Sequence, residues 1–128
     1  MRFGQSSIVV NGSMSGNIFS PAIDMQQVWV YSMQAFYSGV NASSVAGAGT
    51  MKLQVSNDIP STQLSGSTSW TIQHWDDYTG SLASTSSVAG SSSSMWNVNQ
   101  PGYRWVRFAY IAASGSGVLS VNYFGKSV

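Results

Sequence analysis

His74, Asp76 and Asp77 are the residues whose types and spacing come nearest to reactive chemistry in this chain. If they lie in a strand, His74 and Asp76 share one face, because strand side chains alternate with a period of two. A histidine and a carboxylate on one face suit two ligands of a bound Zn²⁺ or Ca²⁺ ion. The sequence offers no matched second pair, so we expect His74 to bond a neighbouring carboxylate. We predict no metal and no other cofactor.

Paired carboxylates for acid–base catalysis would have to come from the four aspartates, since glutamate is absent. Asp76 and Asp77 are adjacent, and adjacent strand residues point to opposite faces. Asp24 and Asp58 each stand beside a turn signal. Serine is abundant, but the chain has no Gly-x-Ser-x-Gly elbow, P-loop or dinucleotide fingerprint. We therefore predict no catalytic residue, and we expect the protein not to be an enzyme.

The aromatic side chains are better candidates for a binding function. The chain has five tryptophans and six tyrosines in 128 residues, and exposed rings can stack on sugars or fill pockets in a partner. Strand alternation predicts that most of these rings form the core. Trp75, Tyr78 and Trp96 lie near predicted loops, and with Phe19 and Trp29 they are the candidate contacts for a protein partner or a glycan.

Short alternating segments, separated by glycine and proline turns, must position these rings. The longest, 26–38, is apolar on both faces, which indicates a central strand covered on both sides or a face buried between subunits. We predict an all-β, antiparallel β-sandwich with a jelly-roll-like arrangement of about eight strands. Residues 1–128 form one predicted domain, in which 1–24 are a candidate extended arm. Other expected strands include 50–57, 69–75, 83–88, 95–98 and 103–112.

The composition is unusual in its lack of charge. Only 7% of residues are charged, where about 25% is usual. The net charge of +1 and the scattered basic residues do not indicate binding to nucleic acid or an anionic membrane. No apolar run approaches the roughly 20 residues of a membrane span, and we expect no secretory signal. A neutral, hydroxyl-rich surface is typical of proteins that contact copies of themselves, a fixed partner or a neutral ligand.

A series of short motifs runs through the second half of the chain, in the order Gly47-Ala-Gly49, Leu53 to Asp58, Trp70, Trp96-Asn97, Tyr103 to Tyr110, Ser114 to Gly117, and Lys126. In this order and spacing, residues 47–126 resemble a group of small structural proteins of tailed-phage particles. The resemblance implies a jelly-roll-like sandwich that decorates the capsid and bridges neighbouring capsid subunits. The implied partners are the major capsid protein and copies of this chain. The implied location is the head surface of the virion, after synthesis in the host cytoplasm.

The Ser-Asn-Asp strand pattern at residues 56–58 is also similar to that of discoidin-like ligand-binding sandwiches. This similarity supports an alternative function, in which the chain is a receptor- or glycan-binding module of a phage tail or fibre. The alternative requires the loop aromatics to be exposed, whereas a shell protein would bury aromatics and methionines in contacts with its neighbours.

Overall fold

The computed structural model of the chain describes residues 2–41, 49–59, 72–78, 83–85 and 92–127, and these residues form antiparallel strands. Across these ranges, no helix is long and apolar enough to cross a membrane. The strands are β1 (Arg2–Ser13), β2 (Ile18–Phe19), β3 (Ile23–Asp24), β4 (Val28–Asn41), β5 (Gly49–Ser56), β6 (Asp76–Asp77), β7 (Ala83–Thr85), β8 (Ser92–Asn99), β9 (Trp105–Ala112) and β10 (Ser116–Ser127).

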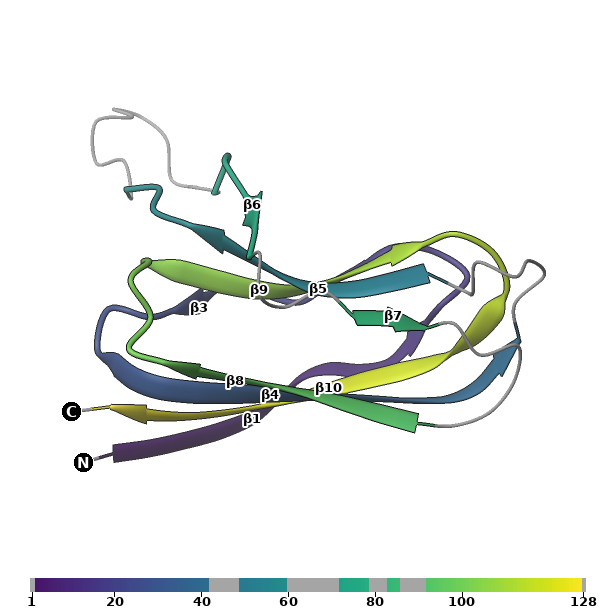
Figure 1. The fold of residues 1–128 in the computed structure, drawn as a ribbon, viewed down its shortest axis with the longest axis horizontal. Coiled ribbons are helices and arrows are strands. Elements are labelled where there is room, and N and C mark those ends of the chain that lie inside the picture. Colours follow the sequence, from purple (N-terminus) through teal and green to yellow (C-terminus); the bar gives the residue numbers. More distant parts are fainter. Residues whose placement is uncertain (1, 42–48, 60–71, 79–82, 86–91, 128) are drawn as a thin grey trace, which may run out of the picture.

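Two sheets stack face to face (Figure 1). The four-stranded sheet has the order β1-β10-β4-β8, and the six-stranded sheet has the order β2-β9-β5-β6, with β3 also on β9 and β7 also on β5. Because β2 and β3 share one neighbour, and β6 and β7 share another, each pair occupies a single position in its sheet. Eight strand positions result, and the connections pass repeatedly between the sheets. This is a jelly roll, and it confirms the predicted all-β antiparallel sandwich.

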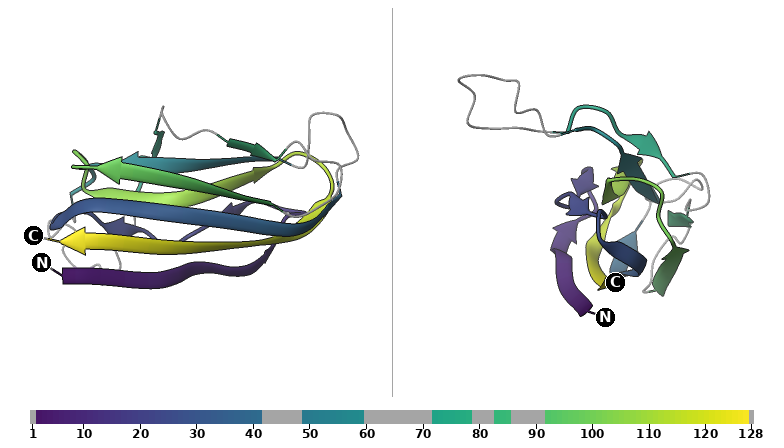
Figure 2. Two further views of the ribbon diagram at one scale, coloured as in Figure 1. Left: turned by 60° about the horizontal axis from the view of Figure 1, so that its bottom comes forward. Right: turned by 90° about the vertical axis from the view of Figure 1, so that its left-hand side faces the viewer.

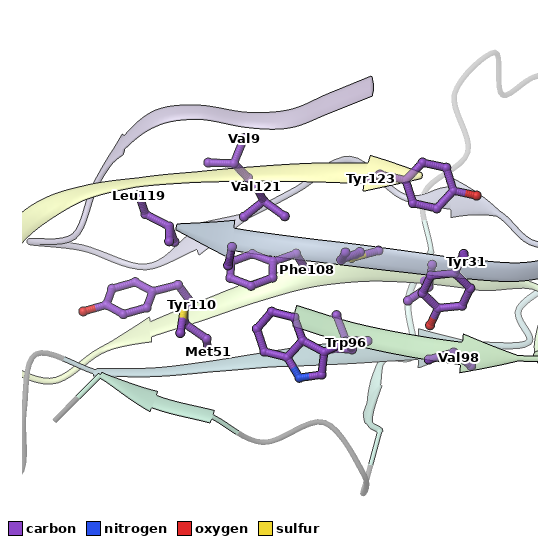
Figure 3. Close-up of a cluster of buried hydrophobic side chains, with 14 of the residues drawn as sticks. Val9, Tyr31, Met51, Trp96, Val98, Phe108, Tyr110, Leu119, Val121 and Tyr123 are labelled. Carbon is purple, nitrogen blue, oxygen red and sulfur yellow. The ribbon is translucent and has the colours of Figure 1, made fainter. Parts of the chain in front are cut away.

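The core lies between the two sheets and follows from alternation along each strand (Figure 3). In β4, Tyr31, Met33 and Ala35 are buried, and the intervening residues face outward. In β9, Val106 and Phe108 point into the same core from the opposite sheet. The hydroxyl groups of Tyr31 and Tyr103 hydrogen-bond to each other. Burial raises the pKa of Tyr31, because desolvation disfavours the phenolate.

Within residues 2–24 the chain forms three strands that pair in the two sheets, in contrast to the extended arm suggested by the sequence. β1 pairs with β10 from Arg2 to Ser13, while β2 and β3 both pair with β9. Figure 2 shows β1 lying alongside β10, with the two termini at the same end of the sandwich. The side chains of Asn17 and Ser20 accept hydrogen bonds from β9 backbone N–H groups at Ala112 and Phe108, which fixes this segment to the six-stranded sheet.

The strand expected at 69–75 is also corrected. Residues 72–75 lie outside any strand, and the following pair, Asp76–Asp77, forms the short strand β6. Part of each expected strand lies outside the described residues: 69–71 of the strand expected at 69–75, and 86–88 of the strand expected at 83–88. The polar composition of β6 gives it no apolar alternation, so its two-residue pairing with Gln54 and Val55 could not be read from the sequence.

Candidate functional site

Several large apolar side chains lie on the exposed face of the four-stranded sheet, outside the core. Val10 is 68% exposed and Met95 62% exposed, and Phe36 and Val118 are also exposed. These residues come from four different strands. Strand pairing places the side chains of Phe36, Met95 and Val118 on the same side of the sheet, and Val10 directly follows the core residue Val9 in β1 and is exposed. We call this surface the outer face and define it by Val10, Val30, Ser32, Gln34, Phe36, Met95, Asn97, Asn99, Val118, Ser120, Asn122, Phe124 and Lys126.

The polar groups on the outer face are almost all neutral. They are side-chain amides and hydroxyls, such as Asn122, whose Oδ1 accepts a hydrogen bond of 3.0 Å from the hydroxyl of Ser7. Lys126 is the single charged residue of the outer face. Because a neutral group costs less to remove from water than an ion, this face can be covered with a smaller desolvation penalty than a typical charged surface.

A shallow groove of about 290 Å³ runs across one end of the outer face. Asn97 and Asn99 of β8 line it together with Ser32 of β4, and the apolar part of its lining includes Met95 and Phe124. Amide and hydroxyl groups beside apolar side chains can hydrogen-bond a neutral polar ligand and contact its apolar surface.

The six-stranded sheet carries a different arrangement, centred on Arg107. Its guanidinium carbon lies 4.4 Å from the ring centroids of both Phe19 and Trp75, so the cation stands between two aromatic rings. Its Nε donates a hydrogen bond of 2.8 Å to Oε1 of Gln54. Partial burial lowers the pKa of Arg107, because desolvation disfavours the charged form. The stack thus connects β2, β5, β9 and the segment before β6.

Other charges on the six-stranded sheet are also paired within the molecule. Lys52 Nζ lies 3.0 Å from Asp77 Oδ2, and Gln54 donates to the other carboxylate oxygen. These two contacts, the bond from Gln54 above all, lower the pKa of Asp77. Arg104 Nε lies 2.9 Å from Asp24 Oδ1. Arg104 and Arg107 thus each contact an aromatic ring and are also held by a carboxylate or an amide oxygen.

The side chain of His74 contacts Asp58, not Asp76 or Asp77. Its Nδ1 lies 3.1 Å from Asp58 Oδ1, and the backbone N–H groups of Gln73 and His74 donate to Asp58 Oδ2 at 2.6 and 3.0 Å. The pKa of Asp58 is lowered, chiefly by the hydrogen bond from Gln73. Among the described residues, no three His, Cys, Asp or Glu side chains come together as metal ligands would.

The five aromatic residues singled out from the sequence fall into three groups. Phe19 and Trp75 meet at Arg107. Trp29 is 51% exposed and lies apart from them on β4. Tyr78 packs against the core beside Tyr103. Trp96 is only 8% exposed and packs edge-to-face on Phe108, so its expected exposure is wrong.

The outer face supplied residues that the sequence did not mark as candidates. Phe36 carried a signal, because the two faces of 26–38 are both apolar. Met95 carried a weaker signal, because strict alternation puts it on the face opposite Trp96 and Val98. The groove could not be anticipated, since its lining comes from β4, β8 and β10.

No protein-family model matches this chain, and no curated protein matches it. Among solved structures, it is similar to the crystal structure of the SPBc2 prophage-derived protein YomS, with a TM-score of 0.51. The superposition covers 98% of this chain and 95% of that chain, at 8% sequence identity. At this identity the likeness is one of fold: over nearly its whole length, the chain shares an overall architecture with a prophage-derived protein.

Proposed function

We propose that this protein is a structural component of a phage particle, and most specifically a capsid decoration protein that binds the head surface and bridges neighbouring capsid subunits. The observation that carries the proposal is the outer face, with exposed apolar residues from four strands and a single charge. Such a surface has the composition of a protein–protein contact, because interface cores are depleted of charge and enriched in aromatic residues and methionine.

The jelly roll and the prophage-derived neighbour are consistent with this role, although a fold by itself is compatible with many functions. In the proposed mechanism the outer face covers apolar surface on adjacent capsid subunits. The shell would be stabilised because separating those subunits would expose that surface to water again. The partners are therefore the major capsid protein and copies of this chain, and the site of action is the virion head.

The proposal is tested by adding purified protein to phage shells that lack it and measuring the bound fraction by sedimentation. The wild-type protein should bind at a simple stoichiometric ratio to the major capsid protein. Phe36→Asp, which places a carboxylate on the outer face, should weaken binding at least about tenfold, since burying an unpaired charge is costly. Ile59→Asp is the matched control: Ile59 is 78% exposed but lies after β5, outside the outer face.

Failure of the wild-type protein to bind such shells would refute shell decoration. Equal binding by Phe36→Asp and wild type, with equal melting temperatures, would show that the outer face is not the contact surface. Loss of binding in Ile59→Asp alone would place the contact near the end of β5 instead.

A second candidate function is recognition of a neutral glycan in the groove. The observation that favours it is the lining itself, in which the amides of Asn97 and Asn99 stand near Phe124. Sugars present both hydroxyl groups and apolar ring faces, and this lining offers partners for both. If the protein binds a neutral glycan on an array, Asn97→Ala should abolish binding without altering the melting temperature, while Trp75→Ala should leave it intact.

A further inference from the structure

The edges of the two sheets differ sharply in how they are protected. Exposed strand edges pair readily with other strands, and proteins suppress this with short strands, charges, prolines or bulges. The edge strands of the six-stranded sheet, β2, β3, β6 and β7, are only two or three residues long. At one edge of the four-stranded sheet, β1 has two irregularities in its pairing with β10, between Ser7 and Val9 and between Val9 and Gly12.

The opposite edge of that sheet, β8, has none of these protections. Its eight residues, Ser92–Asn99, include no charged residue, proline or glycine. It pairs with β4 in continuous register from Asn99 opposite Val30 to Ser92 opposite Tyr37. In the described part of the chain, β4 is its sole strand neighbour. Its most exposed large side chain is Met95, which points to the outer face.

We propose that β8 is a self-association edge, at which two copies of this chain pair their β8 strands antiparallel about a two-fold axis. The two four-stranded sheets then form one continuous eight-stranded sheet. A second copy is the favoured occupant because an uncharged strand meets no like charge when it pairs with itself. A charged strand in the same position would be repelled by its own copy.

The burial pattern of β8 limits the register. Residues directly opposite each other in an antiparallel pair have their side chains on the same face, so Trp96 and Val98 must stay on the core side. A two-fold axis at any residue of β8 meets this condition, and an axis at Met95 or at Trp96, on either side of the midpoint of Ser92–Asn99, pairs the most residues. An axis at Trp96 would oppose two indoles where Trp96 already packs on Phe108. An axis at Met95 instead brings two exposed methionines into contact, and we assign this register.

The absence of cysteine from the chain allows a direct test by crosslinking. In the assigned register, residue 95 faces its own copy at the roughly 4.5–5.5 Å Cα separation of opposed strand residues, which suits a disulfide. The two copies of residue 97 would be about 13 Å apart, too far to be bridged. Under mild oxidation, Met95→Cys should therefore form a covalent dimer, and Asn97→Cys, on the same strand and face, should not. Crosslinking of both variants, of Asn97→Cys alone, or of neither would overturn the assigned pairing.

Sedimentation velocity over a range of concentrations gives an independent test. The wild-type protein should show a monomer–dimer equilibrium, and Met95→Lys, which opposes two lysines across the axis, should raise the dimer Kd about tenfold or more. Val10→Lys is the control, because Val10 is equally apolar and exposed on the outer face but belongs to β1. A wild-type protein that stays monomeric, or a dimer lost in Val10→Lys and kept in Met95→Lys, would overturn the inference. The test uses no capsid shells, so failure of shell binding and failure of β8 pairing are distinguishable.

Discussion

Replacing Trp96 and Trp75 separately by alanine would distinguish a core tryptophan from a surface one. Trp96 is 8% exposed, and its ring centroid lies 5.8 Å from that of Phe108 in an edge-to-face arrangement. Trp75 is only half-buried, and its main described contact is the guanidinium of Arg107, 4.4 Å from the ring centroid. The same change, Trp→Ala, thus removes a core side chain in one variant and a surface stack in the other.

The expected magnitudes are well separated. Removing a buried tryptophan leaves a cavity and costs about 3–5 kcal/mol. Removing Trp75 sacrifices a cation–π contact at a partly exposed site, at a cost of about 0.5–1 kcal/mol. For a chain of 128 residues, each kcal/mol corresponds to about 4 °C in Tm. Trp96→Ala should therefore lower Tm by about 12–20 °C, and Trp75→Ala by about 2–4 °C.

Thermal melts followed by far-ultraviolet circular dichroism are the suitable assay, because this signal arises mainly from the backbone and both variants keep four tryptophans. Guanidinium titrations should give a reduced midpoint for Trp96→Ala with an unchanged m-value if both states keep their compactness. Equal Tm losses in the two variants would refute the separation of core from surface. A stable Trp96→Ala variant would place the indole outside the core and restore it as a contact residue.

Two further predictions concern the backbone and the acid range. A Cβ atom at Gly49 would overlap the carbonyl oxygen of Ile111 and the side chain of Tyr110, whereas one at Gly4 would meet no atom within 4 Å. In chemical denaturation, Gly49→Ala should therefore destabilise the fold by about 1–3 kcal/mol, and Gly4→Ala by less than about 0.5 kcal/mol. Equal losses would contradict the reasoning. Because the folded pKa of Asp58 is lowered from 3.8, its contribution to stability is present above pH 3.8 and is lost as the pH falls through the folded pKa. Melts of wild type and Asp58→Ala should thus differ at neutral pH and converge only as the pH falls below 3.8 and through the lower folded pKa, and a constant difference would rule out the carboxylate as the cause.

The sandwich itself could be predicted from the sequence, because alternation is local information. Tyr31, Met33 and Ala35 alternate with polar or exposed neighbours, and the structure buries all three. Period-two alternation also predicts the burial of Trp96. Its neighbour at two residues, Val98, is a core residue, so period-two alternation puts Trp96 on the core side, while the nearby run of serines suggested a loop.

The remaining features depend on contacts between residues far apart in the chain. β2 and β3 are two residues each, too short to show a period, and Pro21 between them reads as loop. Arg107 reaches Phe19, 88 positions earlier, and Trp75, 32 positions earlier. No spacing rule connects such positions. The sequence therefore indicated which residue types were available, and the topology determined which of them meet.

The two exposed sheet surfaces differ in the number of their charged side chains and in how these are paired within the molecule. This difference favours one surface for association. On the six-stranded sheet, Lys52, Arg104 and Arg107 are each held by a carboxylate, amide or aromatic partner in the same molecule. A partner covering that sheet would have to desolvate these groups without offering them a better bond, which gives little net energy. The outer face instead offers apolar area and neutral hydrogen-bonding groups, and its only ion is Lys126. Since a jelly roll serves many functions, it is this contrast between its two surfaces, more than the fold, that supports an assembly role.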